Sequence, residues 1–166
     1  MITVLIRVTQ GPEALAVTLS ALVPAVADGL VADAIILTAT RDEAIAGVAE
    51  AAGATLVVAP ALSWQEAAQR ARHRWLLCLE DGDVPQEGWI RALDRFVSVN
   101  GERYSRARLR RRQGPLAAIR ASARALWAPT IIRAGDLVRR DFVLGSAKSG
   151  PAMHLSATIE RDPAFS

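Results

Sequence analysis

The order of apolar runs in residues 1–100 constrains the fold more than any other feature of the sequence. Four short runs rich in β-branched and other apolar residues predict strands, and each is followed by a stretch whose apolar residues have helical spacing. The predicted strands span residues 2–8, 34–37, 55–58 and 74–79, and the predicted helices span residues 13–27, 41–52, 63–73 and a stretch that begins near Pro85. This alternation predicts an α/β fold with a doubly wound, mostly parallel sheet, because right-handed crossovers place helices on both faces of such a sheet.

The remaining residues carry weaker patterns. Residues 102–112 are dominated by arginine, residues 116–127 have helical spacing, residues 130–133 predict a strand, residues 136–144 a short helix, and residues 146–166 a tail without clear periodicity. A chain of 166 residues is most simply one domain that buries its core without disulfides or a structural metal. We therefore expect a single domain over residues 1–166.

Charge is distributed unevenly between the two parts of the chain. Residues 1–100 contain 7 basic and 12 acidic side chains, a balance of −5, whereas residues 101–166 contain 13 basic and 5 acidic side chains, a balance of +8. Such asymmetry indicates that the basic part meets an anionic partner, and a phosphorylated ligand, a membrane surface and a nucleic acid are the three candidates.

A run of arginines begins the basic part. It consists of Arg103, Arg106, Arg108, Arg110, Arg111 and Arg112. Guanidinium groups bind phosphate bidentately and clustered basic residues attract anionic lipid, while a solvated loop is the alternative that involves no ligand. Nucleic acid is the least favoured partner, because only Tyr104 interleaves with these arginines and the sequence contains no recognised nucleic-acid module.

The single cysteine and the apolar runs bear on the compartment. Cys78 cannot form an internal disulfide, and its apolar neighbours in sequence predict an inert buried thiol. No apolar run reaches the roughly 18–20 residues that span a bilayer, and Arg7 interrupts the first run, which excludes a signal peptide of the usual kind. We expect a cytoplasmic protein, peripheral to the membrane if its basic part binds anionic lipid.

The acidic cluster Glu80-Asp81-Gly82-Asp83 carries the strongest chemical signal. It directly follows a predicted buried strand, so its carboxylates lie at the carboxyl end of that strand. Oxygen ligands of this kind suit Mg²⁺ or Mn²⁺ bound together with a diphosphate. The alternative is an acidic turn that caps the following helix and interacts with its dipole.

Other common chemical motifs are missing from the sequence. No glycine-rich phosphate loop follows any predicted strand, which disfavours a dinucleotide oxidoreductase and a P-loop NTPase. His73 and His154 have no His or Cys neighbours at ligand spacing, so a zinc site is not expected.

Several segments of residues 2–96 together form a recognisable pattern. They are Thr3-Val4-Leu5-Ile6, Ala49-Glu50-Ala51-Ala52-Gly53-Ala54, Val57-Val58-Ala59-Pro60, and Glu80-Asp81-Gly82-Asp83 with Pro85 and Gly88-Trp89 behind it. In these segments, residues 2–96 resemble the nucleotide-sugar-binding half of family 2 glycosyltransferases, which have the GT-A fold. A weaker likeness covers residues 128–145, where Arg139-Arg140-Asp141-Phe142 is similar to a segment that presents an arginine pair near the active site.

The resemblance implies a fold, a ligand and a set of site residues. It implies a GT-A, Rossmann-like fold with a nucleotide-sugar-binding half at residues 1–99 and a divergent, basic acceptor-side half at residues 100–166. The ligand it implies is a nucleotide-diphospho-sugar, with Mg or Mn as cofactor. It assigns Asp81, Asp83 and Glu80 to the metal, and Thr38, Arg139 and Arg140 to the substrate.

Three departures from the family pattern keep other functions open. Thr38 stands where the family has a base-contacting Asp, a gapless alignment puts Glu80 and Gly82 on the two metal-motif positions, and no catalytic base is identifiable after residue 145, where only Glu160 and Asp162 are acidic. The first hypothesis is a glycosyltransferase. The alternatives are a catalytically degenerate GT-A-like domain that binds a ligand, a membrane surface or a protein, and a plain α/β nucleotide-binding domain.

Overall fold

Four parallel strands form one side of the sheet, in the order of a doubly wound fold. The computed structural model describes residues 1–111, 132–146 and 151–165. The four strands are β1 (Ile2–Arg7), β2 (Val31–Thr38), β3 (Thr55–Val58) and β4 (Trp75–Glu80). β1 pairs in parallel with both β2 and β4, and β2 pairs in parallel with β3. The predicted strand–helix alternation of the first 100 residues is therefore confirmed.

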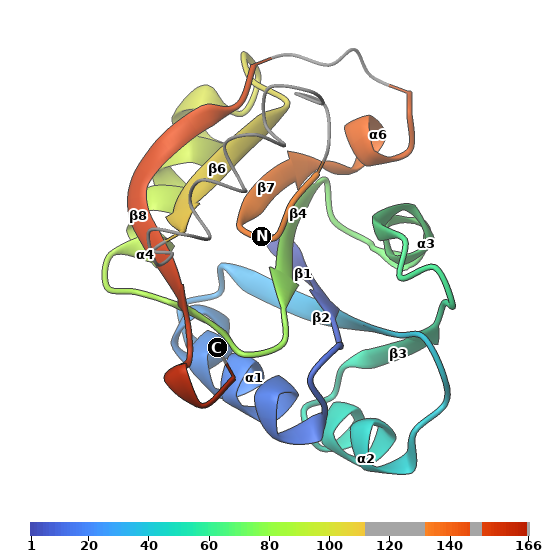
Figure 1. The fold of residues 1–166 in the computed structure, drawn as a ribbon. Helices are drawn as coiled ribbons and strands as arrows, with labels where there is room; N and C mark the ends of the chain where they lie inside the picture. The colour runs from blue at the N-terminus through green and yellow to red at the C-terminus, as the bar shows by residue number, and fades with distance from the viewer. Residues whose placement is uncertain (112–131, 147–150, 166) are drawn as a thin grey trace, which may run out of the picture.

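The second part of the chain extends the same sheet with both strand directions. Its strands are β6 (Arg106–Arg111), β7 (Asp136–Arg139) and β8 (Met153–Arg161), and the short β5 (Asp83–Pro85) lies at the far edge. β7 runs antiparallel to β4 and β6, and β6 runs parallel to β8. The result is one eight-stranded sheet in the order β3-β2-β1-β4-β7-β6-β8-β5, whose ladders are mostly parallel (Figure 1).

Helices cover both faces of this sheet, as the sequence predicts. The helices are α1 (Pro12–Ala27), α2 (Glu43–Ala51), α3 (Trp64–Arg70), α4 (Trp89–Arg95) and α6 (Arg140–Val143), with a π-helical turn η1 (Phe96–Asn100) after α4 and a 3₁₀ turn η2 (Pro163–Phe165) near the end. One core cluster contains residues of α1, α2 and α4, and a second contains residues of α3 and is flanked by α6. Within the described ranges, no helix is long and apolar enough to span a bilayer.

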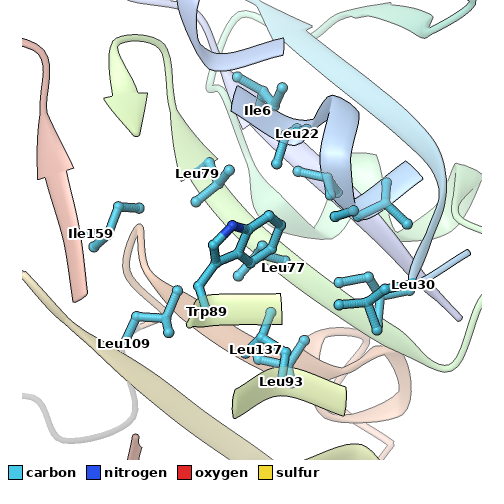
Figure 2. Packing of buried hydrophobic residues seen from close by; sticks show 14 of the residues in the cluster. Ile6, Leu22, Leu30, Leu77, Leu79, Trp89, Leu93, Leu109, Leu137 and Ile159 are labelled. Carbon is cyan, nitrogen blue, oxygen red and sulfur yellow. The ribbon is translucent and has the colours of Figure 1, made fainter. Parts of the chain in front are cut away.

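Strand β4 separates the two cores because its side chains alternate between the faces. Leu77 and Leu79 pack in the first cluster, whereas Leu76 and Cys78 pack in the second. Figure 2 shows the Trp89 ring among Leu77, Leu79 and other aliphatic side chains of the first cluster. Both cores therefore depend on the central strand that ends at the acidic cluster.

Two expectations in the middle and last parts of the chain are wrong. Pro85 ends strand β5, and helix α4 begins only after Gly88, which adopts a left-handed φ of 83°. Residues 136–144 begin as strand β7, because Leu137 and Val138 are buried between β4 and β6, and only α6 is helical.

The arginine-rich segment and the C-terminal tail, for which the sequence predicts no strand, form strands β6 and β8. In β6 the buried residues Ala107 and Leu109 alternate with arginines, and in β8 the buried residues Leu155, Ala157 and Ile159 alternate with less buried ones. A period of two places one side of each strand on the core. Arg106, Arg108, Arg110 and Arg111 of the arginine run therefore lie in a strand, whereas Arg103 lies in an exposed turn before it.

The predicted helix at residues 116–127 lies outside the described residues. So do two residues of the predicted strand at 130–133, and the other two, Ile132 and Arg133, are not in a strand.

The core gives a direct prediction for stability. Leu77 is completely buried in β4, so Leu77→Ala should lower the free energy of unfolding by about 2–5 kcal/mol through lost burial and the cavity left behind. Val99 is 72% exposed, so Val99→Ala should change it by less than about 0.5 kcal/mol. Urea denaturation of both variants measures the difference, and equal effects would contradict this account of the core.

Candidate functional site

The loops that follow β1, β2, β3 and β4 meet at one edge of the sheet. The register puts Arg7, the last residue of β1, beside Leu37 of β2 and Glu80 of β4, and it puts Thr38 beside Val58 of β3. In open α/β sheets, ligands bind outside the carboxyl ends of the parallel strands. A ligand site is therefore expected at this carboxyl edge.

Asp81 is fully buried and holds the loop between β1 and α1. Its Oδ2 accepts hydrogen bonds from the backbone N–H groups of Thr9, Gln10 and Gly11 at 2.9, 2.6 and 3.0 Å, and its Oδ1 accepts from the Thr9 hydroxyl at 3.1 Å. Converging donors of this kind stabilise a carboxylate away from water. Asp81 thus fixes the shape of the first loop of the carboxyl edge.

Glu80 and Asp83 form an ion-pair network with two arginines from the second part of the chain. Asp83 is fully buried, and its Oδ2 accepts from Nη2 of Arg111 at 2.7 Å and from the backbone N–H of Glu80 at 2.8 Å. Nη2 of Arg161 donates to Oε2 of Glu80 at 2.7 Å and lies 3.7 Å from Oδ1 of Asp83. Two carboxylates therefore face two guanidinium groups, which is the pairing that buried charges require.

Gly82 forms a tight turn beneath the C-terminal segment. Its φ is 83°, its N–H donates to the carbonyl oxygen of Ala14 at 3.0 Å, and its own carbonyl oxygen accepts from the N–H of Asp162 at 2.8 Å. A Cβ at Gly82 would lie 3.2 Å from Cβ of Phe165, so a side chain here meets both strain and crowding. No carboxylate fits at this position, which the gapless alignment pairs with a metal-motif acid.

The acidic cluster in this arrangement does not fit a divalent metal. Asp81 accepts four hydrogen bonds from the loop after β1, and Oδ2 of Asp83 and Oε2 of Glu80 are bonded to guanidinium groups. Among the residues that the structure describes, no group of three His, Cys, Asp or Glu side chains is placed to hold a metal ion. Oδ1 of Asp83 is a buried atom without a hydrogen bond there, but it faces Arg161.

The other predicted site residues do not lie together. Thr38 is at the carboxyl edge, where it is buried and its hydroxyl donates to the carbonyl oxygen of Thr40 at 2.7 Å. Arg139 pairs with Trp75 in the sheet, at the amino end of β4, because β7 runs antiparallel to β4. Arg140 follows directly, and its N–H donates to the carbonyl oxygen of Arg74. The predicted substrate-binding arginines are therefore at the opposite end of β4 from the acidic cluster.

Both of these arginines have partners within the fold. Nε of Arg140 donates to the carbonyl oxygen of Ala68 at 2.8 Å, which satisfies a carbonyl near the end of α3. Arg139 forms a two-pronged ion pair with Asp141, and this bonding lowers the pKa of the Asp141 carboxyl. Their geometry is that of structural residues around α6.

Sequence reasoning missed a stacked pair at the carboxyl edge. The Arg7 guanidinium lies 3.7 Å from the centroid of the Trp64 ring, which is a cation–π contact. Burial lowers the pKa of Arg7, although Cys78 and Glu80 oppose this effect. Nε of Arg7 and Nε1 of Trp64 are buried without a hydrogen-bond partner in the part of the chain that the structure describes. Only the position of Arg7 at the end of its strand could have indicated this pair.

A second missed feature is the buried pair Arg108–Asp136. Asp136 is fully buried at the start of β7 and accepts from Nε and Nη2 of Arg108 at 2.5 and 2.9 Å. This bonding raises the pKa of Arg108. Arg108 and Arg111 of the run thus pair with buried carboxylates, while Arg103 and Arg110 are exposed.

The single cysteine is also buried. Burial raises the pKa of Cys78 well above its ordinary value, which supports the expectation of an inert thiol.

The role of Asp81 gives a prediction that separates a loop anchor from a metal ligand. Asp81→Ala should lower the free energy of unfolding by about 3 kcal/mol or more, because it leaves three backbone donors without their charged acceptor. Asp94→Ala, at an exposed position of α4, is the matched control and should change it by less than about 0.5 kcal/mol. Guanidinium denaturation measures both, and a loss below about 1 kcal/mol for Asp81→Ala would contradict the anchoring role.

Solved glycosyltransferase structures share this fold. Mannosyl-3-phosphoglycerate synthase from Rubrobacter xylanophilus has a TM-score of 0.67 with 11% identity, over 98% of this chain and 66% of that one. Glucosyl-3-phosphoglycerate synthase from Mycobacterium tuberculosis, solved with Mn²⁺, UDP and glucosyl-3-phosphoglycerate, has a TM-score of 0.63 with 13% identity, over 93% of this chain and 70% of that one. Residues 1–349 of S. aureus TarS have a TM-score of 0.59 with 10% identity, over 98% of this chain and 60% of that one.

These similarities concern structure and not sequence. The sequence matches no protein-family model, and a search of curated proteins finds no match. The chain spans between 60% and 70% of the length of the three solved proteins. At identities of 10–13%, the similarity shows the fold alone, and the chain has the GT-A-like fold that its sequence predicts.

Proposed function

We propose that the chain binds a nucleotide-diphospho-sugar at the carboxyl edge of β1–β4 and transfers the sugar to an acceptor. The observation that carries the proposal is the GT-A-like fold with a charged segment, Glu80–Asp83, at the carboxyl end of β4. Two of the similar structures are named as enzymes that make sugar-phosphoglycerate compounds, and one of them was solved with UDP. Fold alone does not determine function, so the proposal also needs chemistry at this edge.

That chemistry suits an anionic nucleotide. Arg7, Arg111 and Arg161 bring guanidinium groups to the edge, and guanidinium binds phosphate oxygens through paired N–H donors. Trp64, which is buried and stacked against Arg7, supports that guanidinium group at the edge, and Thr38 is the proposed neighbour of the base at the end of β2. We propose that Asp81 acts indirectly, by holding the loop of residues 9–11 in place.

The carboxylates of the loop are not free to hold the Mg²⁺ or Mn²⁺ predicted from the sequence. Glu80 and Asp83 would first have to release Arg161 and Arg111, and Asp81 would have to release the loop after β1. We therefore propose the nucleotide site on the chain's own residues, and we leave Arg139 and Arg140 outside it because they lie at the other end of β4.

A second candidate function is favoured by one observation. Each carboxylate of the loop, in Glu80, Asp81 and Asp83, already bonds an N–H or a guanidinium group, so none is placed as a free general base. This arrangement fits a catalytically inactive domain that binds the nucleotide-sugar or an anionic surface through its basic part. A turnover assay separates the two functions, because only a transferase releases UDP from UDP-glucose in the presence of an acceptor. The first acceptor to test is 3-phosphoglycerate.

Tryptophan fluorescence tests the nucleotide site itself. Titration of the full chain with UDP-, GDP- and dTDP-sugars should give a saturable change, because a ligand at the edge alters the surroundings of Trp64. The change should disappear in Trp64→Phe and persist in Trp89→Phe, whose ring packs in the core between α4 and the sheet.

Two outcomes would count against the proposal. No response to any of the three nucleotides, with EDTA or with MnCl₂, would contradict nucleotide-sugar binding. A response lost in Trp89→Phe and kept in Trp64→Phe would place the ligand elsewhere. A stabilising shift of the melting temperature with the same ligand should accompany true binding, since a ligand that binds only the folded state stabilises it.

A further inference from the structure

The acidic loop after β4 has its charge balanced by the protein itself. Glu80 and Asp83 contribute two negative charges, and Arg161 and Arg111 contribute two positive charges at 2.7 Å. Asp81 is stabilised separately, by hydrogen bonds from three backbone N–H donors and a hydroxyl. A divalent cation between these carboxylates would meet two guanidinium groups of like charge.

Gly82 has no side chain that could bind a metal, and its surroundings leave no room for one. The backbone there has a left-handed φ of 83° and lies directly under Phe165 of η2. The N–H of Asp162 fixes the same residue from the C-terminal side, at the end of β8 that carries Arg161. The segment that closes over Gly82 therefore also delivers the guanidinium group.

The two arginines retain donors after pairing. A guanidinium group has five N–H donors, and Arg111 and Arg161 both contact the carboxylates through Nη2. Both side chains are partly exposed, at 19% and 21%, whereas the Asp83 carboxylate between them is fully buried. Within the residues that the structure describes, their remaining N–H groups are available to an anion that approaches from solvent.

We propose that Arg111 and Arg161 take the place of the divalent metal and bind the diphosphate of the nucleotide-sugar. This inference rests on the proposed nucleotide function. Glu80 and Asp83 act as positioning residues, because each holds one guanidinium group toward the carboxyl edge. A charged, bidentate donor supplies the positive charge at a phosphate without a metal ion. The loop then needs neither Mg²⁺ nor Mn²⁺ for binding.

Calorimetric titration of the full chain with UDP tests this assignment. The dissociation constant for UDP should agree within about twofold between buffers that contain EDTA and MnCl₂. Arg161→Met should weaken UDP binding about tenfold or more in both buffers, because it removes a charge-assisted contact. Arg161→Lys, which keeps the charge without the planar fork, should be intermediate.

The matched control is Arg110→Ala, which removes the same charge from an exposed position of β6 next to Arg111. It should leave the UDP dissociation constant within about twofold of wild type if the effect of Arg161→Met comes from a specific contact and not from net charge. Circular dichroism checks that each variant is folded, and if Arg161→Met does not fold, the wild-type titrations in the two buffers decide the matter.

Electron paramagnetic resonance of Mn²⁺ gives a readout without nucleotide. The signal of free Mn²⁺ should be unchanged by an excess of the protein. Stoichiometric Mn²⁺ binding that is lost in Glu80→Gln, or UDP binding at least about tenfold tighter with Mn²⁺ than with EDTA, would overturn the inference and leave the nucleotide function intact. Absence of UDP, GDP and dTDP binding in both buffers would overturn the nucleotide function and the role of Arg161 together.

Discussion

The ion-pair network of Glu80 and Asp83 with Arg111 and Arg161 is the interaction on which the rest of the site depends. It joins the end of β4 to β6 and β8, which are far apart from it in sequence but belong to the same sheet (Figure 1). A buried carboxylate needs either an opposite charge, as here, or converging hydrogen-bond donors. The network also accounts for part of the charge asymmetry of the sequence, because the acidic first part and the basic second part neutralise each other where they meet.

The other two residues of the acidic cluster fix the surrounding loops. Asp81 bonds the loop before α1, while Gly82 turns the chain so that Asp83 begins β5 and pairs with Arg161 of β8. The acidic cluster therefore has three different roles within four residues: a link to Arg161, a loop anchor, and a buried partner of Arg111. In this fold the carboxylates of the cluster have structural roles. The guanidinium groups of Arg111 and Arg161 are the part of the network that can bind a ligand.

The strands and helices that local pattern decides could be predicted from the sequence, and long-range features could not. β3 was predicted at its observed bounds because Thr55–Val58 is a short run with clear stops. The place of Arg139 depends on the antiparallel direction of β7, which pairs with a strand some sixty residues away in sequence, and no local signal encodes this. β6 was missed because its arginines obscured the alternation of Ala107 and Leu109, and those arginines have buried partners that only the fold reveals.

Anomalous diffraction from crystals of the protein grown with UDP-glucose and MnCl₂ tests the central claim most directly. The account predicts electron density for the diphosphate at the carboxyl edge, guanidinium nitrogens of Arg161 within about 3 Å of phosphate oxygens, and no manganese peak at the loop after β4. A manganese peak bonded to Glu80 or Asp83, with Arg161 displaced from them, would contradict it.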